Sequence, residues 1–336
     1  MSNYNMKQWV ADLVGNHPKK PMPILSFPSV SLLGVTVKEM ILDSDLQARG
    51  MQAAAENTPA AASVSFMDLS VEAECFGAAV CITDNEVPTI KGRYVNDMDE
   101  AKALAVPPIG SGRTQICIDA IRNACAVITD RPVLAGVIGP FSLAARLLDV
   151  SEIMIDCYDD PDMVHTVLEK ATAFLINYIR AFKAAGAHGV MMAEPVAGLL
   201  SPSLEAEFSA PYVKQITDAV QDDEFLMIYH NCGDNVPMML DSILSTGAAA
   251  YHFGNAVDMA DILQSVPSDT VVMGNIDPAG VLCMGTPESV RTATLGLMKK
   301  CARYPGFVPS SGCDIPPATP WDNIEAFFKA VYDYGK

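Results

Sequence analysis

Short apolar runs alternate with longer stretches of helical periodicity along this chain of 336 residues. Most of the runs are continuously apolar and rich in Val, Ile and Met, which is typical of parallel strands that are buried on both faces. We predict eight strands, at residues 22–27, 63–67, 133–138, 189–193, 225–229, 249–253, 270–273 and 307–309.

The stretches between these runs carry helix start and stop signals. The longest predicted helix spans 161–185, with Asp160 as its N-cap, Pro161 at its first position and Gly186 after its end. Further helices are predicted at 203–220, 286–301 and 320–334.

Strands that are each followed by a helix predict an α/β fold, a (β/α)8 TIM barrel, as a single domain over residues 1–336. The alternative is an open doubly wound sheet, which is disfavoured because no glycine-rich phosphate-binding motif follows any predicted strand. Residues 68–131 are too long for one connection between a strand and its helix. Within them, residues 72–94 are predicted to form a hairpin inserted after the second strand.

Composition and charge exclude several classes of protein. Half of the residues are hydrophobic, which is incompatible with a disordered chain. The formal net charge is −18, from 22 basic and 40 acidic residues. Nucleic-acid binding is therefore not expected, because it needs a basic surface.

The N-terminal segment has no signal-peptide pattern, and no run of about 18 apolar residues is free of Pro, Gly or charge. We therefore expect no membrane association. The nine cysteines are an odd number in a chain that is long enough to fold without disulfides. Together these features predict a cytoplasmic protein with reduced thiols.

In a barrel, the chemistry lies where strands end and the following loops begin. The polar residues just after the predicted strands are Asp68, Glu72, Glu74, Glu194, His230, Asn231, Cys232, Asn275, Asp277, Cys313 and Asp314. They are expected on one face of the barrel.

His230, Cys232 and Cys313 are the sharpest candidates. Residues i and i+2 of an extended segment point the same way, so His230 and Cys232 can reach one ion, and Cys313 follows the last predicted strand. One imidazole and two thiolates suit Zn²⁺, and three protein ligands leave a position open, as in catalytic zinc sites. The competing interpretation is that these are ordinary buried residues, as we expect for the other seven cysteines.

Other candidates are less specific. Asp277 precedes Pro278 and could either cap a helix or act in catalysis. Glu194 could be a fourth, exchangeable zinc ligand, a partner of a ligand, or a solvated acid. His252 is predicted to be a packed strand residue.

The motifs also resemble a known family. The segment His230-Asn231-Cys232 with Cys313, the segments 68–74, 139–143 and 274–278, and Ser201-Pro202 are similar to the uroporphyrinogen decarboxylase superfamily over nearly the whole chain. The His-x-Cys…Cys set resembles one branch, the zinc-dependent methylcobamide:coenzyme M methyltransferases. The resemblance implies a barrel that binds a methylated corrinoid over its mouth, with the methyl group delivered by a separate corrinoid protein.

Two differences from the decarboxylase indicate which branch of the superfamily this chain resembles. The decarboxylase carries an arginine-rich loop after its first strand, where this chain has no Arg at 26–31. It also has a Tyr shortly after its Pro-Trp-Thr turn, which is absent after Pro140. The net charge of −18 further disfavours an octa-anionic tetrapyrrole as the substrate.

We therefore expect a methyltransferase that moves a methyl group from a methylated corrinoid to a thiol such as coenzyme M, with Zn²⁺ on His230, Cys232 and Cys313. In this interpretation Asp68, Glu74 and Asp277 are catalytic, while Glu194, Asn231 and Asn275 bind the cofactor. The alternatives are a tetrapyrrole decarboxylase and a corrinoid-binding barrel in which the zinc is structural. The acceptor could also be another thiol or tetrahydrofolate.

Overall fold

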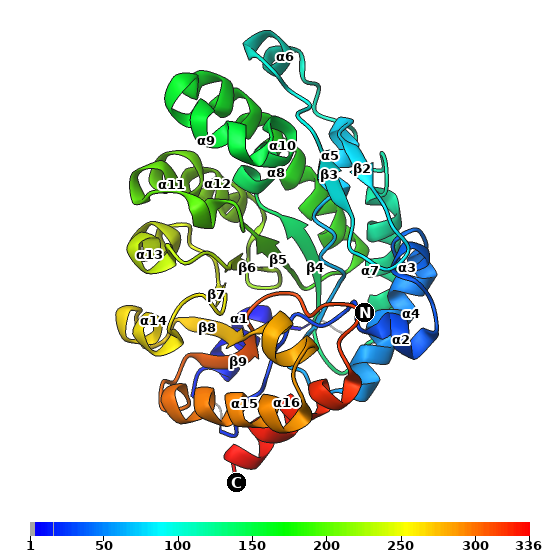
Figure 1. The fold of residues 1–336 in the computed structure, drawn as a ribbon, viewed down its shortest axis with the longest axis vertical. Coiled ribbons are helices and arrows are strands. Elements are labelled where there is room, and N and C mark those ends of the chain that lie inside the picture. The colour runs from blue at the N-terminus through cyan, green and yellow to red at the C-terminus, as the bar shows by residue number, and fades with distance from the viewer. Residues whose placement is uncertain (1–3, 16) are drawn as a thin grey trace.

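A curled parallel sheet forms the centre of the computed structural model, which describes residues 4–15 and 17–336. Seven strands lie side by side in the order β1-β4-β5-β6-β7-β8-β9, and helices cover the outer face of the sheet (Figure 1). This is the TIM-like α/β fold that the sequence predicts. The strands are β1 (Ser63–Val64), β4 (Val133–Ile138), β5 (Gly189–Ala193), β6 (Leu226–Asn231), β7 (Ala250–Phe253), β8 (Val271–Ile276) and β9 (Phe307–Ser311).

The predicted strand at residues 22–27 is the exception. This segment is buried between β9 and β1, and the Met22 N–H donates to the Pro309 carbonyl while the Ala61 N–H donates to the Pro21 carbonyl. Pro21 and Pro23 lack an N–H, so no regular ladder can form. The segment therefore closes the gap between the outermost strands with isolated hydrogen bonds.

Helices surround the sheet in the positions that the sequence indicates, with one correction. Residues 203–220 form two helices, because the backbone turns at Ser209 and Pro211 starts a new helix without needing an N–H partner. The longer helices are α1 (Met6–Leu13), α4 (Ser44–Asn57), α7 (Thr114–Val127), α8 (Pro140–Leu148), α9 (Val150–Asp159), α10 (Pro161–Ala185), α12 (Ala210–Val220), α13 (Val236–Ser245), α15 (Pro287–Cys301) and α16 (Trp321–Tyr334).

The shorter helices lie mainly in the loops, and they are α2 (Ser29–Leu33), α3 (Val37–Ile41), α5 (Val71–Phe76), α6 (Met98–Ala103), α11 (Pro202–Phe208), α14 (Met259–Ser265), the 3₁₀ turn η1 (Ala197–Leu199) and the π-helical turn η2 (Pro278–Cys283). No helix in the described part of the chain has the length and apolar character needed to cross a membrane.

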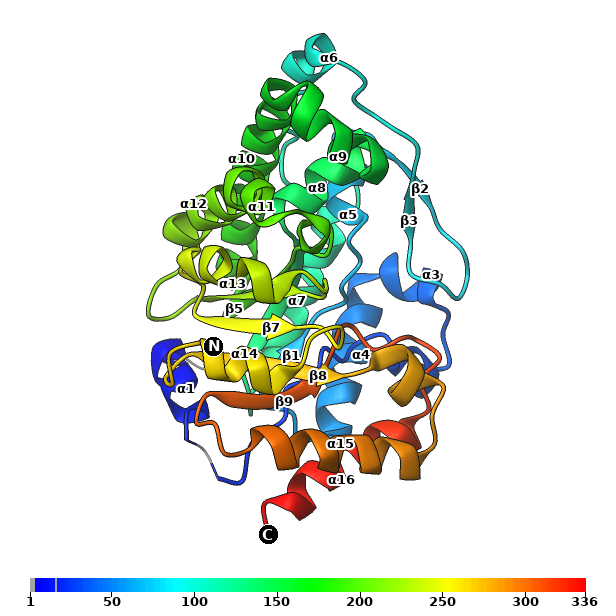
Figure 2. The same cartoon turned by 60° about the vertical axis from the view of Figure 1, so that its left-hand side comes forward.

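The hairpin insertion after β1 is present but shorter than predicted. The strands β2 (Ala79–Cys81) and β3 (Thr89–Lys91) pair antiparallel along one side of the molecule (Figure 2). Residues 71–76, at the start of the predicted hairpin, form the helix α5 instead.

Alternation along the strands divides the core into two layers. Val190, Met192 and Met227 pack outward against the helices, whereas Met191 and Ile228 pack inward with side chains from the other strands. Inward-facing positions therefore come every second residue on each strand. This alternation decides which polar side chains at the strand ends can point into the barrel.

Glu72 ties α5 to the end of β4. Its Oε1 accepts a hydrogen bond from the Ile138 N–H at 3.1 Å, while its Oε2 is buried without a partner among the described residues. Burial raises the pKa of Glu72 from 4.5 to about 7. The protonated form is thus favoured in the folded chain, and the stability it contributes is lost as the pH rises through about 7.

Glu72→Gln is expected to stabilise the protein by about 3 kcal/mol at pH 8, because the variant avoids burying a charge. The gain should fall below about 1 kcal/mol at pH 5, where the wild-type carboxyl is protonated in the folded chain. Urea unfolding at the two pH values measures the difference. Glu86→Gln, at an exposed position of the hairpin, is the matched control and should show no such dependence. An equal effect of Glu72→Gln at both pH values would contradict this account.

Candidate metal centre

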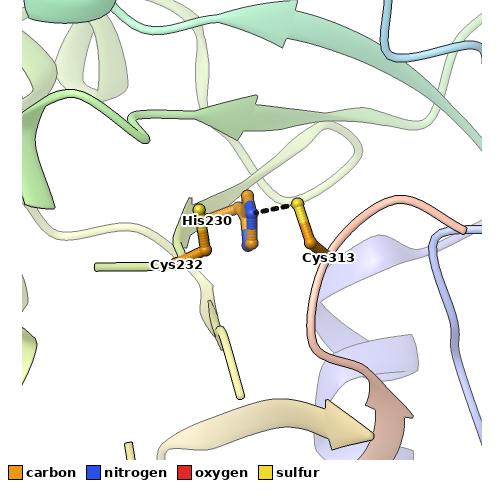
Figure 3. A group of neighbouring side chains, drawn as sticks. All are labelled: His230, Cys232 and Cys313. Carbon is orange, nitrogen blue, oxygen red and sulfur yellow. Dashed lines mark hydrogen bonds between the residues drawn. The ribbon is translucent and has the colours of Figure 1, made fainter. Parts of the chain in front are cut away.

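The end of β6 brings two candidate ligands to the inside of the barrel. Ile228 faces the interior layer, so His230 faces it as well, and Cys232 follows two residues later. Strand register places His230 directly beside His252 of β7. Cys313 comes from the loop that follows β9 and lies on the other side of the His230 ring from Cys232 (Figure 3).

The three side chains form a compact group of potential metal ligands. One ligand atom from each of His230, Cys232 and Cys313 lies within 4.8 Å of the others. The Cys313 Sγ is 3.4 Å from the His230 Nε2, which is the contact drawn in Figure 3. His230 is 2% exposed and the two cysteines are half-buried. A nitrogen and two sulfurs at such spacing fit the donor set that zinc prefers.

The thiol of Cys232 differs from the cysteines of the helices. The neighbouring Cys313 thiol and His230 lower the pKa of Cys232 to about 4. The neighbouring Cys232 and burial hold the pKa of Cys313 well above its usual range. Burial raises the pKa of four cysteines that the sequence places in helices to about 12; they are Cys117, Cys125, Cys157 and Cys301. Because metals bind thiolates, the low pKa separates Cys232 from these four cysteines, whereas Cys313 would have to lose its proton on binding a metal.

A chain of buried hydrogen bonds leads away from His230. Its Nδ1 is 2.8 Å from the His252 Nδ1, and the His252 Nε2 is 2.8 Å from the Ser310 Oγ. Ser310 in turn donates to the Met22 carbonyl at 2.7 Å. His252 is fully buried, as predicted, but the sequence analysis missed its contact with His230. This contact could have been predicted from the alternation of inward- and outward-facing residues along the two strands, because both histidines occupy inward-facing positions.

A cavity of about 330 Å³ opens beside the candidate metal ligands. His230, Cys313 and Asp314 supply its polar lining. The remaining lining residues are apolar: Ile24, Met67, Leu69, Val87, Ala193, Pro195, Ile315, Pro316 and Pro317. The Asp314 Oδ1 is buried without a partner among the described residues, and burial raises the pKa of this carboxyl well above its usual range. The cavity can therefore hold a small, largely apolar group next to the sulfur of Cys313.

Asp68 and Glu74, two of the predicted catalytic residues, lie together beyond β1. Arg113 pairs with the Asp68 carboxylate and donates to the Glu74 Oε2 at 2.7 Å and to the Ser70 Oγ at 2.7 Å. The Ser70 hydroxyl donates to Asp68 at 2.6 Å. The charge of the nearly buried Arg113 is thus balanced by two acids. Catalytic roles for Asp68 and Glu74 stay a prediction.

The carboxylate of Glu194 lies at the N-terminus of α8. Its oxygens accept hydrogen bonds from the N–H groups of Phe141 and Ser142 at 2.8 and 2.9 Å, and from the Ser142 hydroxyl at 2.7 Å. Gly139 leaves the room for this contact, since a Cβ there would lie 2.3 Å from the Glu194 side chain. The compact group of ligand atoms does not include Glu194. Its predicted cofactor contact stays a prediction beside this capping role.

The other predicted residues also make local contacts. Asn231 accepts from the Gly233 N–H and donates to the Tyr229 hydroxyl, and Asn275 donates to two loop carbonyls. The Asp277 carboxylate accepts from the N–H groups of Ala279 and Gly280, both at 2.9 Å, as the capping alternative expects. These side chains hold the loops at the barrel mouth, while their proposed parts in cofactor binding or catalysis stay predictions.

Two curated relatives of different activity match this chain over most of its length. Uroporphyrinogen decarboxylase of Coxiella burnetii (strain RSA 493 / Nine Mile phase I) is 28% identical over 294 residues, which cover 82% of this chain and 78% of the relative. The methylcobamide:CoM methyltransferase MtbA of Methanosarcina acetivorans is 26% identical over 275 residues, covering 80% of this chain and 78% of the relative.

A solved structure shares the whole fold. A methyltransferase from Methanosarcina mazei superposes with a TM-score of 0.87 at 22% identity, covering 99% of this chain and 100% of that chain. A B12-independent methionine synthase from Shewanella sp. W3-18-1 is a more distant neighbour, with a TM-score of 0.56 at 11% identity and coverage of 96% and 97%. The family model for uroporphyrinogen decarboxylase (URO-D) matches residues 29–334. The chain therefore belongs to the uroporphyrinogen decarboxylase family, as its motifs predict.

Proposed function

We propose that this protein is a zinc-dependent methyltransferase that transfers a methyl group from a methylated corrinoid, carried by a partner protein, to a small thiol such as coenzyme M. The observation that carries the proposal is the convergence of His230, Cys232 and Cys313 beside a cavity whose other lining residues, apart from Asp314, are apolar. Similarity to a methylcobamide:CoM methyltransferase supports it.

The donor set fits zinc in a catalytic rather than a structural role. Three protein ligands lie together among the described residues, which leaves one position of a tetrahedral ion for another molecule. Zn²⁺ held there would lower the pKa of a thiol that binds in this position. The cavity beside Cys313 gives such a thiol a place with largely apolar walls.

The methyl transfer needs no additional oxidant or reductant. A lone pair of the acceptor sulfur forms the new S–CH₃ bond, and the electron pair of the Co–C bond stays on cobalt, which passes from Co(III) to Co(I). The thiol proton leaves to solvent. Apolar walls around the cavity keep water from competing with the sulfur for the methyl group.

The cavity lining also bears on the decarboxylase alternative. A tetrapyrrole with eight carboxylates needs cationic partners, but no Lys or Arg is among the residues that line this cavity. Arg113 lies outside that lining and is paired with Asp68 and Glu74. The lining of the cavity therefore disfavours a substrate with many carboxylates.

Protein purified without added zinc is expected to hold about one equivalent of zinc per chain, and Cys232→Ala to hold less than about half an equivalent, because one thiolate ligand is lost. Elemental analysis by mass spectrometry measures both. Cys81→Ala, in the hairpin strand β2, is the matched control and should retain the metal. Wild-type protein with less than about half an equivalent, unchanged in Cys232→Ala, would contradict the zinc site.

Methylcobalamin and a thiol are expected to give an S-methyl thioether and a reduced corrinoid when the zinc-loaded protein is added. Cys313→Ala should lower the rate by at least about 100-fold, because it removes a proposed zinc ligand. Loss of a residue that only hydrogen-bonds to a ligand commonly costs at most about 100-fold. Mass spectrometry of the thioether and the cobalt absorption spectrum follow the two products.

Two further measurements separate the alternatives. Extended X-ray absorption should show a new sulfur neighbour of zinc when thiol is added, whereas four unchanged protein ligands would indicate structural zinc. Release of CO₂ from uroporphyrinogen, without thioether formation, would instead identify a decarboxylase.

A further inference from the structure

The donor and the acceptor of each hydrogen bond behind His230 can be assigned by starting from the Met22 carbonyl. The Met22 carbonyl can only accept, so the Ser310 hydroxyl, 2.7 Å away, must donate to it. With its only proton committed, the Ser310 oxygen accepts from the His252 Nε2–H at 2.8 Å. The direction of the first two bonds therefore follows from the chemistry of a backbone carbonyl.

The protonation of His252 determines which nitrogen of His230 carries a proton. His252 is fully buried, and burying a charged imidazolium costs far more than burying a neutral ring, so the neutral form is favoured. A neutral ring that is protonated on Nε2 has a lone pair on Nδ1, which lies 2.8 Å from the His230 Nδ1. The His230 Nδ1 must then carry a proton and donate it. This leaves the lone pair of His230 on Nε2, the atom that faces the Cys313 sulfur.

We propose that His252 is a positioning residue which, with Ser310 and the Met22 carbonyl, holds His230 in the tautomer that presents Nε2 to the metal. The role rests on the proposed zinc site. Without the His252 imidazole, the His230 Nδ1–H would keep only the longer contact to the backbone carbonyl of residue 252, at 3.3 Å, and the His230 ring would be held less firmly about its side-chain bonds. A ligand that is fixed in advance binds metal more tightly, and loss of such partners commonly weakens metal binding 10–100-fold.

A positioning role differs from a packing role because it depends on the acceptor nitrogen of the His252 ring. His252→Phe keeps an aromatic ring in the interior but removes the nearer acceptor of the His230 Nδ1–H, at 2.8 Å, and leaves only the backbone carbonyl of residue 252, at 3.3 Å. His252→Gln restores an acceptor oxygen on a side chain of similar length. Tyr251→Phe is the matched control on the same strand, because Tyr251 faces outward and donates to the Leu244 carbonyl.

The test measures zinc affinity by competition with a chromophoric chelator, which needs no methyl transfer. His252→Phe is expected to weaken zinc binding by about 10–100-fold, His252→Gln to recover most of that loss, and Tyr251→Phe to leave the affinity unchanged. Zinc affinity of His252→Phe within threefold of wild type, in a protein with the same circular dichroism spectrum, would overturn the proposal. Equal losses in the Phe and Gln variants would overturn it as well, since they would indicate packing alone.

A second measurement needs no substitution at His252 and covers the case in which the variants do not fold. In metal-free wild-type protein labelled with ¹⁵N-histidine, the ring nitrogens of His230 should show a protonated Nδ1 and an unprotonated Nε2. A protonated Nε2 would contradict the assignment. Because neither measurement involves a corrinoid or a methyl group, the zinc ligand could be positioned in this way even if the proposed transfer reaction failed, and the two outcomes are distinguishable.

Discussion

The register between β6 and β7 is the constraint on which the candidate site depends. It sets His230 directly beside His252 on the inner surface of the sheet, where alternation has already selected which side chains face inward. A shift of one residue in either strand would turn one of the two rings toward the outer helices, where Tyr229 and Tyr251 now pack. The candidate ligand His230 is thus positioned by the same backbone pairing that builds the barrel wall.

Closure of the barrel is connected to the same group of residues. The segment at 21–27 cannot form a continuous ladder because Pro21 and Pro23 lack N–H groups, so its remaining carbonyls must find other donors. One of them, at Met22, receives the Ser310 hydroxyl that also contacts His252. The irregular edge of the sheet thereby anchors a chain of hydrogen bonds that ends at the candidate metal ligand His230.

Sequence patterns were sufficient for most of the fold because buried parallel strands are continuous apolar runs. Residues 133–138, 189–193 and 161–185 match β4, β5 and α10. The pattern failed where a backbone rule overrides hydrophobicity, as with the prolines at 21 and 23, and where a local turn at Ser209 divides a periodic stretch. Helix α5 was missed since its six residues are too few for a clear helical period.

In the candidate site, too, some features can be predicted from residue types, whereas others depend on the three-dimensional structure. His230, Cys232 and Cys313 could be found because their chemistry is uncommon and each follows an apolar run. The surroundings of Glu194 and Asp277 could not be predicted, because an acidic residue at a strand end looks the same in the sequence whether it caps a helix or faces a substrate.

What distinguishes the two cases is the number of hydrogen bonds that each carboxyl group already accepts. Glu194 accepts three hydrogen bonds from α8, whereas the Asp314 Oδ1, in a carboxyl beside the cavity, has none among the described residues. A carboxylate with several donors gains little from a ligand, while a carboxyl oxygen without a partner is costly to bury until something binds it. By this criterion, of the acids that follow the strands, Asp314 has more to gain than Glu194 from contact with whatever occupies the cavity.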